Sequence, residues 1–144
     1  MNWKNEAVEM LRSYEIMRHA AGNLPRQIRI LEEEAATIKA GSATLSRSRG
    51  RGRREDVLLD HLMKRQELEK QLSQTQGWLE TMDDALDALG QEERQILQTL
   101  FVRPESGAVA DLCQTLGVEY ATLYRRRDKA LQRFTRALYG ALES

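Results

Sequence analysis

The chain has 144 residues, of which 31% are charged and 41% hydrophobic, with two prolines, one cysteine and a formal net charge of zero. This length suits one domain, or one small domain with an extended arm, and the abundance of Leu and Ala predicts an all-α fold. The lone cysteine excludes an internal disulfide. Without an apolar run of about 18 residues we expect neither a membrane span nor a signal peptide, and hence a cytoplasmic protein.

Positive and negative charges are separated along the sequence. Residues 41–54 hold five arginines and no acid, whereas residues 71–93 hold six acids and no base. Between Glu119 and Tyr139 there are six Lys or Arg and two acids. The total charge gives no sign of nucleic-acid binding, but clustered basic segments of this kind are typical of it.

Residues 1–40 carry two apolar rows with helical spacing, separated at Gly22. We expect the first helix to run from about Asn2 to Ala21 and the second to begin after Asn23, with Pro25 in its first turn. The pattern predicts an N-terminal helical hairpin whose two rows form a packing seam. The rows are Trp3, Ala7, Met10, Tyr14 and Met17, and then Leu24, Ile28, Leu31, Ala35 and Ile38.

Residues 41–54, GSATLSRSRGRGRR, lack an apolar row and are rich in Gly, Ser and Arg, which predicts a non-helical break. Two interpretations stay open: a solvated linker, or an arm whose guanidiniums contact phosphates or enter a narrow minor groove of DNA. Arginine at every basic position suits the arm, because a guanidinium binds phosphate in a bidentate manner. The basic residues of this segment are Arg47, Arg49, Arg51, Arg53 and Arg54.

Residues 55–90 are predicted to form one long helix, with Glu55 and Asp56 at its N-terminus and Gly77 as its only breaker. Apolar residues alternate spacings of four and three along it, which is a heptad seam. Such a seam must be buried, either against the N-terminal hairpin or against a second chain. We expect intrachain packing together with self-association, with a dimer favoured. The seam consists of Leu68, Leu72, Thr75, Leu79, Met82, Leu86 and Leu89.

Residues 91–144 are predicted to form a C-terminal helical domain. After a short helix over 91–102 and a break at 103–107, two helices follow over 108–116 and from 119 to about 142. They meet at Gly117, which reaches positive φ without strain. This pattern indicates a helix-turn-helix in which the small Cys113 faces the partner helix and Leu123 fills the crevice. In the short helix, Ile96, Leu97, Leu100 and Phe101 should face inward and Glu92, Glu93 and Arg94 outward.

The sequence LGVEYATLYRRRDKALQRF, preceded by ALGQEERQILQTLF, resembles region 4 of the extracytoplasmic-type sigma factors. It resembles more closely the phage late-gene transcriptional regulators of the ArpU and RinA type, which share that module. Residues 89–142 carry the resemblance, and residues 24–86 match only in layout. The resemblance implies a sigma-like DNA-binding domain, in which Arg127 stands where the family usually has an apolar residue.

A helix-turn-helix of this kind places the first turns of helix 119–139 in the major groove of double-stranded DNA. Arg125 can present a bidentate guanidinium to O6 and N7 of guanine, and Thr122 and Tyr120 can reach a phosphate or a thymine methyl. The neighbouring basic residues suit backbone phosphates, which supply affinity but no sequence information. The predicted DNA-binding residues of this helix are Glu119, Tyr120, Ala121, Thr122, Tyr124, Arg125, Arg126 and Lys129.

The sequence offers no constellation for catalysis, for a metal or for a cofactor. The two histidines, His19 and His61, are far in sequence from Cys113, so we interpret this cysteine as a core residue and expect no zinc site. A glycine-rich phosphate loop is also absent. We therefore expect a protein that is not an enzyme and needs no cofactor.

Two functions fit this layout. The first is a phage-type transcriptional regulator, with the acidic long helix as a candidate contact for RNA polymerase. The second is a small terminase subunit, a DNA-packaging protein that also joins a helix-turn-helix to a helical oligomerisation arm. The sigma-like motif favours the regulator. The oligomeric state would distinguish the two functions, because a dimer would support the regulator and a ring would support the small terminase subunit. A complete sigma factor is not expected, because the N-terminal half lacks an aromatic-rich segment for melting DNA.

Overall fold

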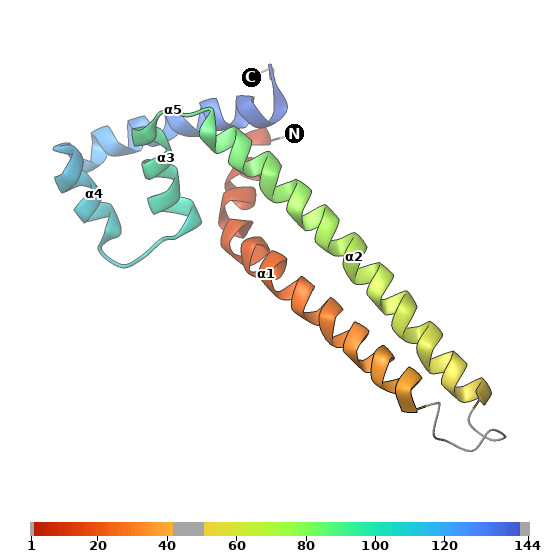
Figure 1. Cartoon of the computed structure of the whole chain (residues 1–144). Coiled ribbons are helices and arrows are strands. Elements are labelled where there is room, and N and C mark those ends of the chain that lie inside the picture. The colour runs from red at the N-terminus through yellow and green to blue at the C-terminus, as the bar shows by residue number, and fades with distance from the viewer. Residues whose placement is uncertain (1, 42–50, 142–144) are drawn as a thin grey trace. The chain divides into compact units, whose positions relative to one another are not determined.

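The structure is a computed structural model that describes residues 2–41 and 51–141. Its elements are α1 (Trp3–Gly41), α2 (Arg51–Asp87), α3 (Gln91–Leu97), the π-helical turn η1 (Gln98–Val102), α4 (Ala108–Leu116) and α5 (Tyr120–Tyr139) (Figure 1). Every regular element in these ranges is helical, so the predicted all-α fold is confirmed. No helix within them has both the length and the apolar character that crossing a bilayer requires.

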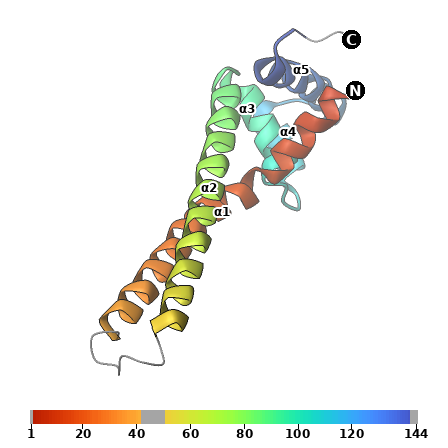
Figure 2. The same cartoon turned by 90° about the vertical axis from the view of Figure 1, so that its right-hand side faces the viewer.

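The helices form two compact units. The head unit comprises Met1–Met17 and Trp78–Ser144, and the hairpin unit comprises Arg18–Gly77. Within the hairpin unit, the later part of α1 and the earlier part of α2 run side by side, as two perpendicular views show (Figures 1 and 2). The head unit contains the other ends of these two helices together with α3, η1, α4 and α5.

The core of the head unit joins α1, α2, α3 and α5. Leu11 of α1, Met82 of α2 and Phe134 of α5 are fully buried, and each such side chain stabilises the fold by about 1.5–3 kcal/mol relative to exposure. At the edge of this core the Tyr14 hydroxyl donates to the Asp83 carboxylate at 2.5 Å. The later half of α5 therefore packs against α2 within this core. The remaining buried members are Ala7, Ala85, Leu86, Leu89, Leu97, Val102, Ala130 and Leu131.

The predicted helical hairpin within residues 1–40 is wrong, because α1 is one continuous helix with Gly22 and Pro25 inside it. Gly22 does not adopt positive φ, so it continues the helix instead of ending it. Pro25 removes one backbone hydrogen bond, a cost of about 3 kcal/mol in a helix interior. Packing offsets this cost, since Leu24 is buried and Leu31 lies against α2.

The predicted basic linker 41–54 is longer than the structure allows. Gly41 ends α1, and α2 begins at Arg51, so Arg51, Arg53 and Arg54 lie in a helix. Arginine is a strong helix former, and the single Gly52 costs only about 1 kcal/mol relative to alanine. Arg47 and Arg49 lie outside the described residues.

The heptad row of α2 is packed within the chain. Leu86 and Leu89 are buried in the head unit, whereas Leu68 and Leu72 are half-buried in the hairpin unit. Gly77, in the middle of this row, is accommodated without a break in α2. The predicted intrachain packing is confirmed, and the predicted self-association stays a prediction.

Candidate nucleic-acid interface

The turn between α4 and α5 is centred on Gly117, which has φ 67° and ψ 36° in the left-handed region. The Gly117 N–H donates to the carbonyl of Gln114 at 3.3 Å, and the Val118 N–H donates to that of Cys113 at 3.0 Å. These two bonds form a Schellman motif, which satisfies the last carbonyls of α4. The predicted helix end at Gly117 is confirmed.

A second apolar cluster fixes α4 and the first half of α5 to α3. Its buried members are Ile96 of α3, Leu112 and Cys113 of α4, and Leu123 of α5. Cys113 is only 7% exposed, so its small side chain lies in the core, as predicted. Val118 packs against this cluster from the turn and is half-buried. The cluster therefore sets the direction in which the exposed side of α5 faces.

The short helix before this pair differs from its prediction. Residues 91–102 were expected to form a single α-helix, but after Leu97 the chain widens into the π-helical turn η1. The Arg103 N–H donates to the carbonyl of Gln98 at 2.8 Å, five residues earlier, which is the π-type bond. Residues 103–107 then break the helical pattern, as predicted.

Two arginines of α5 bind the first turn of α3. Arg133 Nη1 lies 2.6 Å from Glu93 Oε1, and Arg126 donates to the carboxylate of Glu92. Glu93 was expected to face solvent, but its side chain is only 20% exposed because it also accepts the Gly90 N–H at 3.3 Å. Arg126, a predicted DNA contact, is thus already paired with a carboxylate of the same chain.

The side of α5 that faces away from the core is exposed and basic. Ala121, Arg125 and Lys129 follow one another at a spacing of four, so they lie one above the other on this side. Arg125 Nη2 donates to the hydroxyl of Thr122 at 3.3 Å. Over residues 2–41 and 51–141, neither Arg125 nor Lys129 forms an ion pair, so both cations are available to a ligand.

Two residues missing from the predicted set continue this row. Gln132 and Arg136 are exposed and follow Lys129 at spacings of three and four, which place them on the same side of α5. That spacing is visible in the sequence and would have identified them. We define the outer row of α5 as Ala121, Arg125, Lys129, Gln132 and Arg136.

Two exposed tyrosines flank the outer row at the start of α5. Tyr120 and Tyr124 are 51% and 39% exposed, and their ring centroids lie 6.4 Å apart. The Arg127 guanidinium stacks over the Tyr124 ring at 4.9 Å and also pairs with Asp128 at 3.0 Å. Arg127 is therefore half-buried on an aromatic ring.

The remaining predicted site residues are distributed over both units. Glu119 is the extended residue before α5 (φ −82°, ψ 163°), and its side chain makes no capping hydrogen bond. In the hairpin unit, Arg53 is exposed and Arg54 is half-buried.

Among the described residues, no group of three or more His, Cys, Asp or Glu side chains is arranged to hold a metal ion.

Comparison with family models, with curated protein sequences and with solved structures found no match to this chain.

Proposed function

We propose that this chain is a sequence-specific, double-stranded-DNA-binding transcriptional regulator that reads the major groove with the first half of α5. The observation that carries the proposal is the division of α5 into two sides. Arg126 and Arg133 are paired with Glu92 and Glu93, whereas Arg125 and Lys129 on the outer row have no carboxylate partner among the described residues.

The proposed contacts follow from donor geometry. The planar guanidinium of Arg125 matches the two acceptors O6 and N7 of a guanine, and the Thr122 hydroxyl beside it orients that guanidinium. Lys129 and Arg136 lie farther along the same row and are proposed to contact backbone phosphates. We therefore assign base reading to Arg125. We assign binding affinity without sequence preference to Lys129 and Arg136.

The fixed turn supports the same proposal. Groove reading requires the reading helix to be held rigidly, because a loosely held side chain loses geometric discrimination. The Schellman bonds at Gly117 and the buried Leu123 hold the start of α5 against α4. The exposed Tyr120 lies at the same end, and we propose that it packs on a sugar or a thymine methyl.

Selection from a pool of random duplexes tests this function. The full chain should enrich one sequence pattern containing at least one fixed G·C pair, and the enriched duplex should bind more tightly than a scrambled duplex of equal length. Recovery of an unbiased pool would contradict sequence-specific binding. Light scattering in the same buffer separates regulation from packaging, since a closed ring of many subunits would favour a small terminase subunit.

A further inference from the structure

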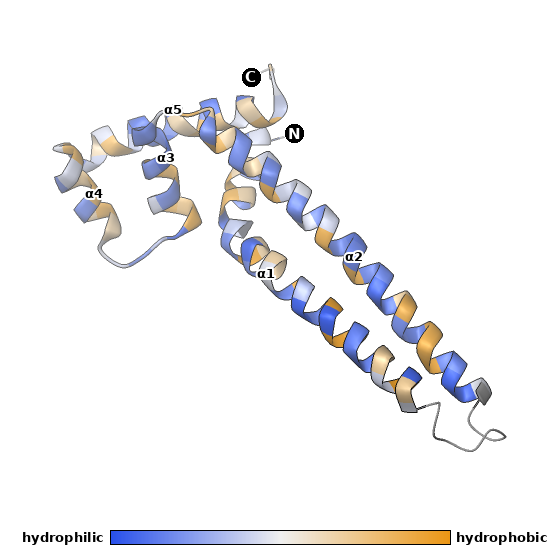
Figure 3. Ribbon diagram, viewed as in Figure 1, coloured by the Kyte–Doolittle hydropathy of each residue, from blue (hydrophilic) through white to orange (hydrophobic). Residues whose placement is uncertain are grey.

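One groove between α1 and α2 in the hairpin unit combines apolar surface with positive charge. Its volume is about 320 Å³, within the range of small-molecule pockets. No acidic side chain of the described residues lines it. Hydrophobic and hydrophilic turns alternate along this part of α2 (Figure 3). We call it the basic groove, and the lining residues that matter below are Leu31, Leu58, Leu62, Lys39, His61 and Arg65.

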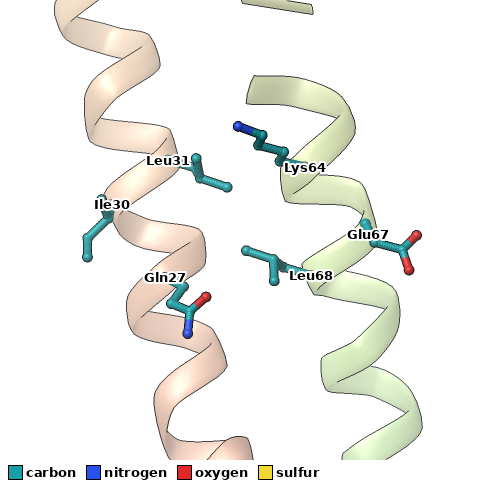
Figure 4. A pocket seen from close by; sticks show the side chains of 6 residues that line it. All are labelled: Gln27, Ile30, Leu31, Lys64, Glu67 and Leu68. Atoms are coloured by element: carbon teal, nitrogen blue, oxygen red, sulfur yellow. The ribbon is translucent and has the colours of Figure 1, made fainter. Parts of the chain in front are cut away.

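A neighbouring groove of the same unit shares Leu31 but differs in charge. In it Leu31 and Leu68 point toward each other between the two helices (Figure 4). Lys64 and Glu67 both line this second groove, so its positive and negative side chains offset each other. Of the two grooves, the basic groove is therefore the one that suits an anion.

His61 of the basic groove already has its partners within the chain. Its Nδ1 lies 2.9 Å from the Val57 carbonyl, and its Nε2 lies 2.8 Å from Glu34 Oε2 of α1. The carboxylate of Glu34 offsets the charge that the protonated ring carries. His61 therefore holds α1 and α2 together and offers little to a ligand.

Arg65, one turn after His61, lacks a comparable partner. Its Nε is shielded from solvent, and no hydrogen-bond acceptor for this atom lies among the residues that the structure describes. Its ion-pair partner, Glu69 Oε1, is 3.6 Å from Nε, which is beyond hydrogen-bonding distance. Shielded donors of native proteins are normally satisfied by a protein group, a water or an ion. The Arg65 guanidinium is therefore the group in this groove that is suited to bind an anion.

We propose that the basic groove binds an amphiphilic carboxylate, with its head group on the Arg65 guanidinium and its aliphatic chain along the leucines. A carboxylate matches the planar guanidinium in a bidentate manner. A purely polar anion would leave Leu31, Leu58 and Leu62 uncovered, whereas an aliphatic chain buries them. The small volume suits one extended chain, because a helix with its side chains is about 10–12 Å wide. This inference does not depend on DNA binding.

Calorimetric titration of the full chain with decanoate tests the proposal. Decanoate should bind as one molecule per chain, and decanol should bind at least about tenfold more weakly because it lacks the charged head group. Octanoate should bind several-fold more weakly than decanoate, because it buries less apolar surface. No binding of decanoate, binding of several molecules per chain, or equal affinities for decanoate and decanol would overturn the proposal.

Two variants of neighbouring residues locate the head group. Arg65→Gln should weaken decanoate binding at least about tenfold and leave decanol binding unchanged, because a charge-assisted hydrogen bond is lost. Lys64→Gln is the matched control, since it removes the same charge one residue away but from the second groove, and it should bind decanoate as wild type does. Helix content by circular dichroism should be equal in all three proteins. Equal losses in both variants would mean a general attraction of anions and would overturn the assignment to Arg65, and the wild-type titrations do not depend on the folding of either variant.

Discussion

Glu93 Oε1 in the first turn of α3 accepts two donors: Arg133 Nη1 of α5 at 2.6 Å and the Gly90 N–H at 3.3 Å. One carboxylate thus caps α3 and also fixes α5. The neighbouring Glu92 binds Arg126 only, and both members of that pair are close to half exposed.

We predict that Glu93→Ala costs about 1–2 kcal/mol of stability, because it removes a helix cap together with an ion pair. Glu92→Ala should cost less than about 1 kcal/mol, as expected of an exposed pair. Urea denaturation of both variants measures the difference. Equal losses would mean that the Gly90 contact contributes nothing.

Gly117→Ala should destabilise the chain by about 1–2 kcal/mol, since an L-residue is strained at φ 67°. No heavy atom lies within 4 Å of an added Cβ, so the loss would come from backbone strain and not from a clash. Gly117→Asn is the control, because asparagine tolerates this region better. Thermal unfolding should rank wild type first, asparagine second and alanine last, and any other order would argue against the left-handed turn.

Gly22→Ala tests the continuity of α1. In a helix interior this change should stabilise the chain by about 0.5–1 kcal/mol, and the space around Gly22 is open. Gly77→Ala in the interior of α2 is the matched control and should have the same sign. If Gly22→Ala lowers the melting temperature while Gly77→Ala raises it, α1 ends near Gly22 after all.

We predict that His61 makes the stability of the hairpin unit depend on pH. Its Nδ1 lies 2.9 Å from the Val57 carbonyl and its Nε2 lies 2.8 Å from Glu34 of α1. Both partners are acceptors, so only the doubly protonated ring can donate to both. The hydrogen bond to Val57 and then that to Glu34 raise the pKa of His61 above 6.5, against partial burial and the charge of Lys64.

Because this pKa is raised on folding, its contribution is fully present below pH 6.5 and is lost as pH rises through the folded-state pKa. The melting temperature of wild type should therefore fall more steeply above pH 6.5 than the melting temperature of His61→Gln. His19→Gln, at an exposed position, should follow wild type. Parallel pH profiles for wild type and His61→Gln would contradict the predicted contribution of this pair.

Local patterns in the sequence predicted α4, α5 and the turn between them. The apolar spacing from Leu123 to Phe134 was sufficient to predict a helix there, and Gly117 was sufficient to predict where the preceding helix ends. Amphipathic spacing and positive φ are properties of short segments, so a local pattern can reveal them. The continuity of α1 was not predictable in the same way. Gly22 and Pro25 are local signals for a helix end, and they are overridden by packing against residues that follow more than 25 positions later in the chain.

The candidate site shows the same limit. The basic character of α5 follows from its sequence, but the division between paired and available arginines does not. Arg126 and Arg133 meet carboxylates that lie 34 and 40 residues earlier, and only the folded chain brings them together.

Leu11 was missed from the predicted apolar row of α1. Both Leu11 and Met10 have a helical spacing from Ala7, and only the fold decides which of the two side chains is buried.

The measurement that tests the central proposal most directly is a salt titration of DNA binding by Arg125→Ala and Lys129→Ala on the selected and the scrambled duplex. Arg125→Ala should cost about 1–3 kcal/mol on the selected duplex and relax the preference at one base pair. Lys129→Ala should weaken both duplexes alike and reduce the salt slope by about 0.9, because one phosphate contact is lost. If Arg125→Ala binds both duplexes exactly as wild type does, α5 is not the helix that reads the groove.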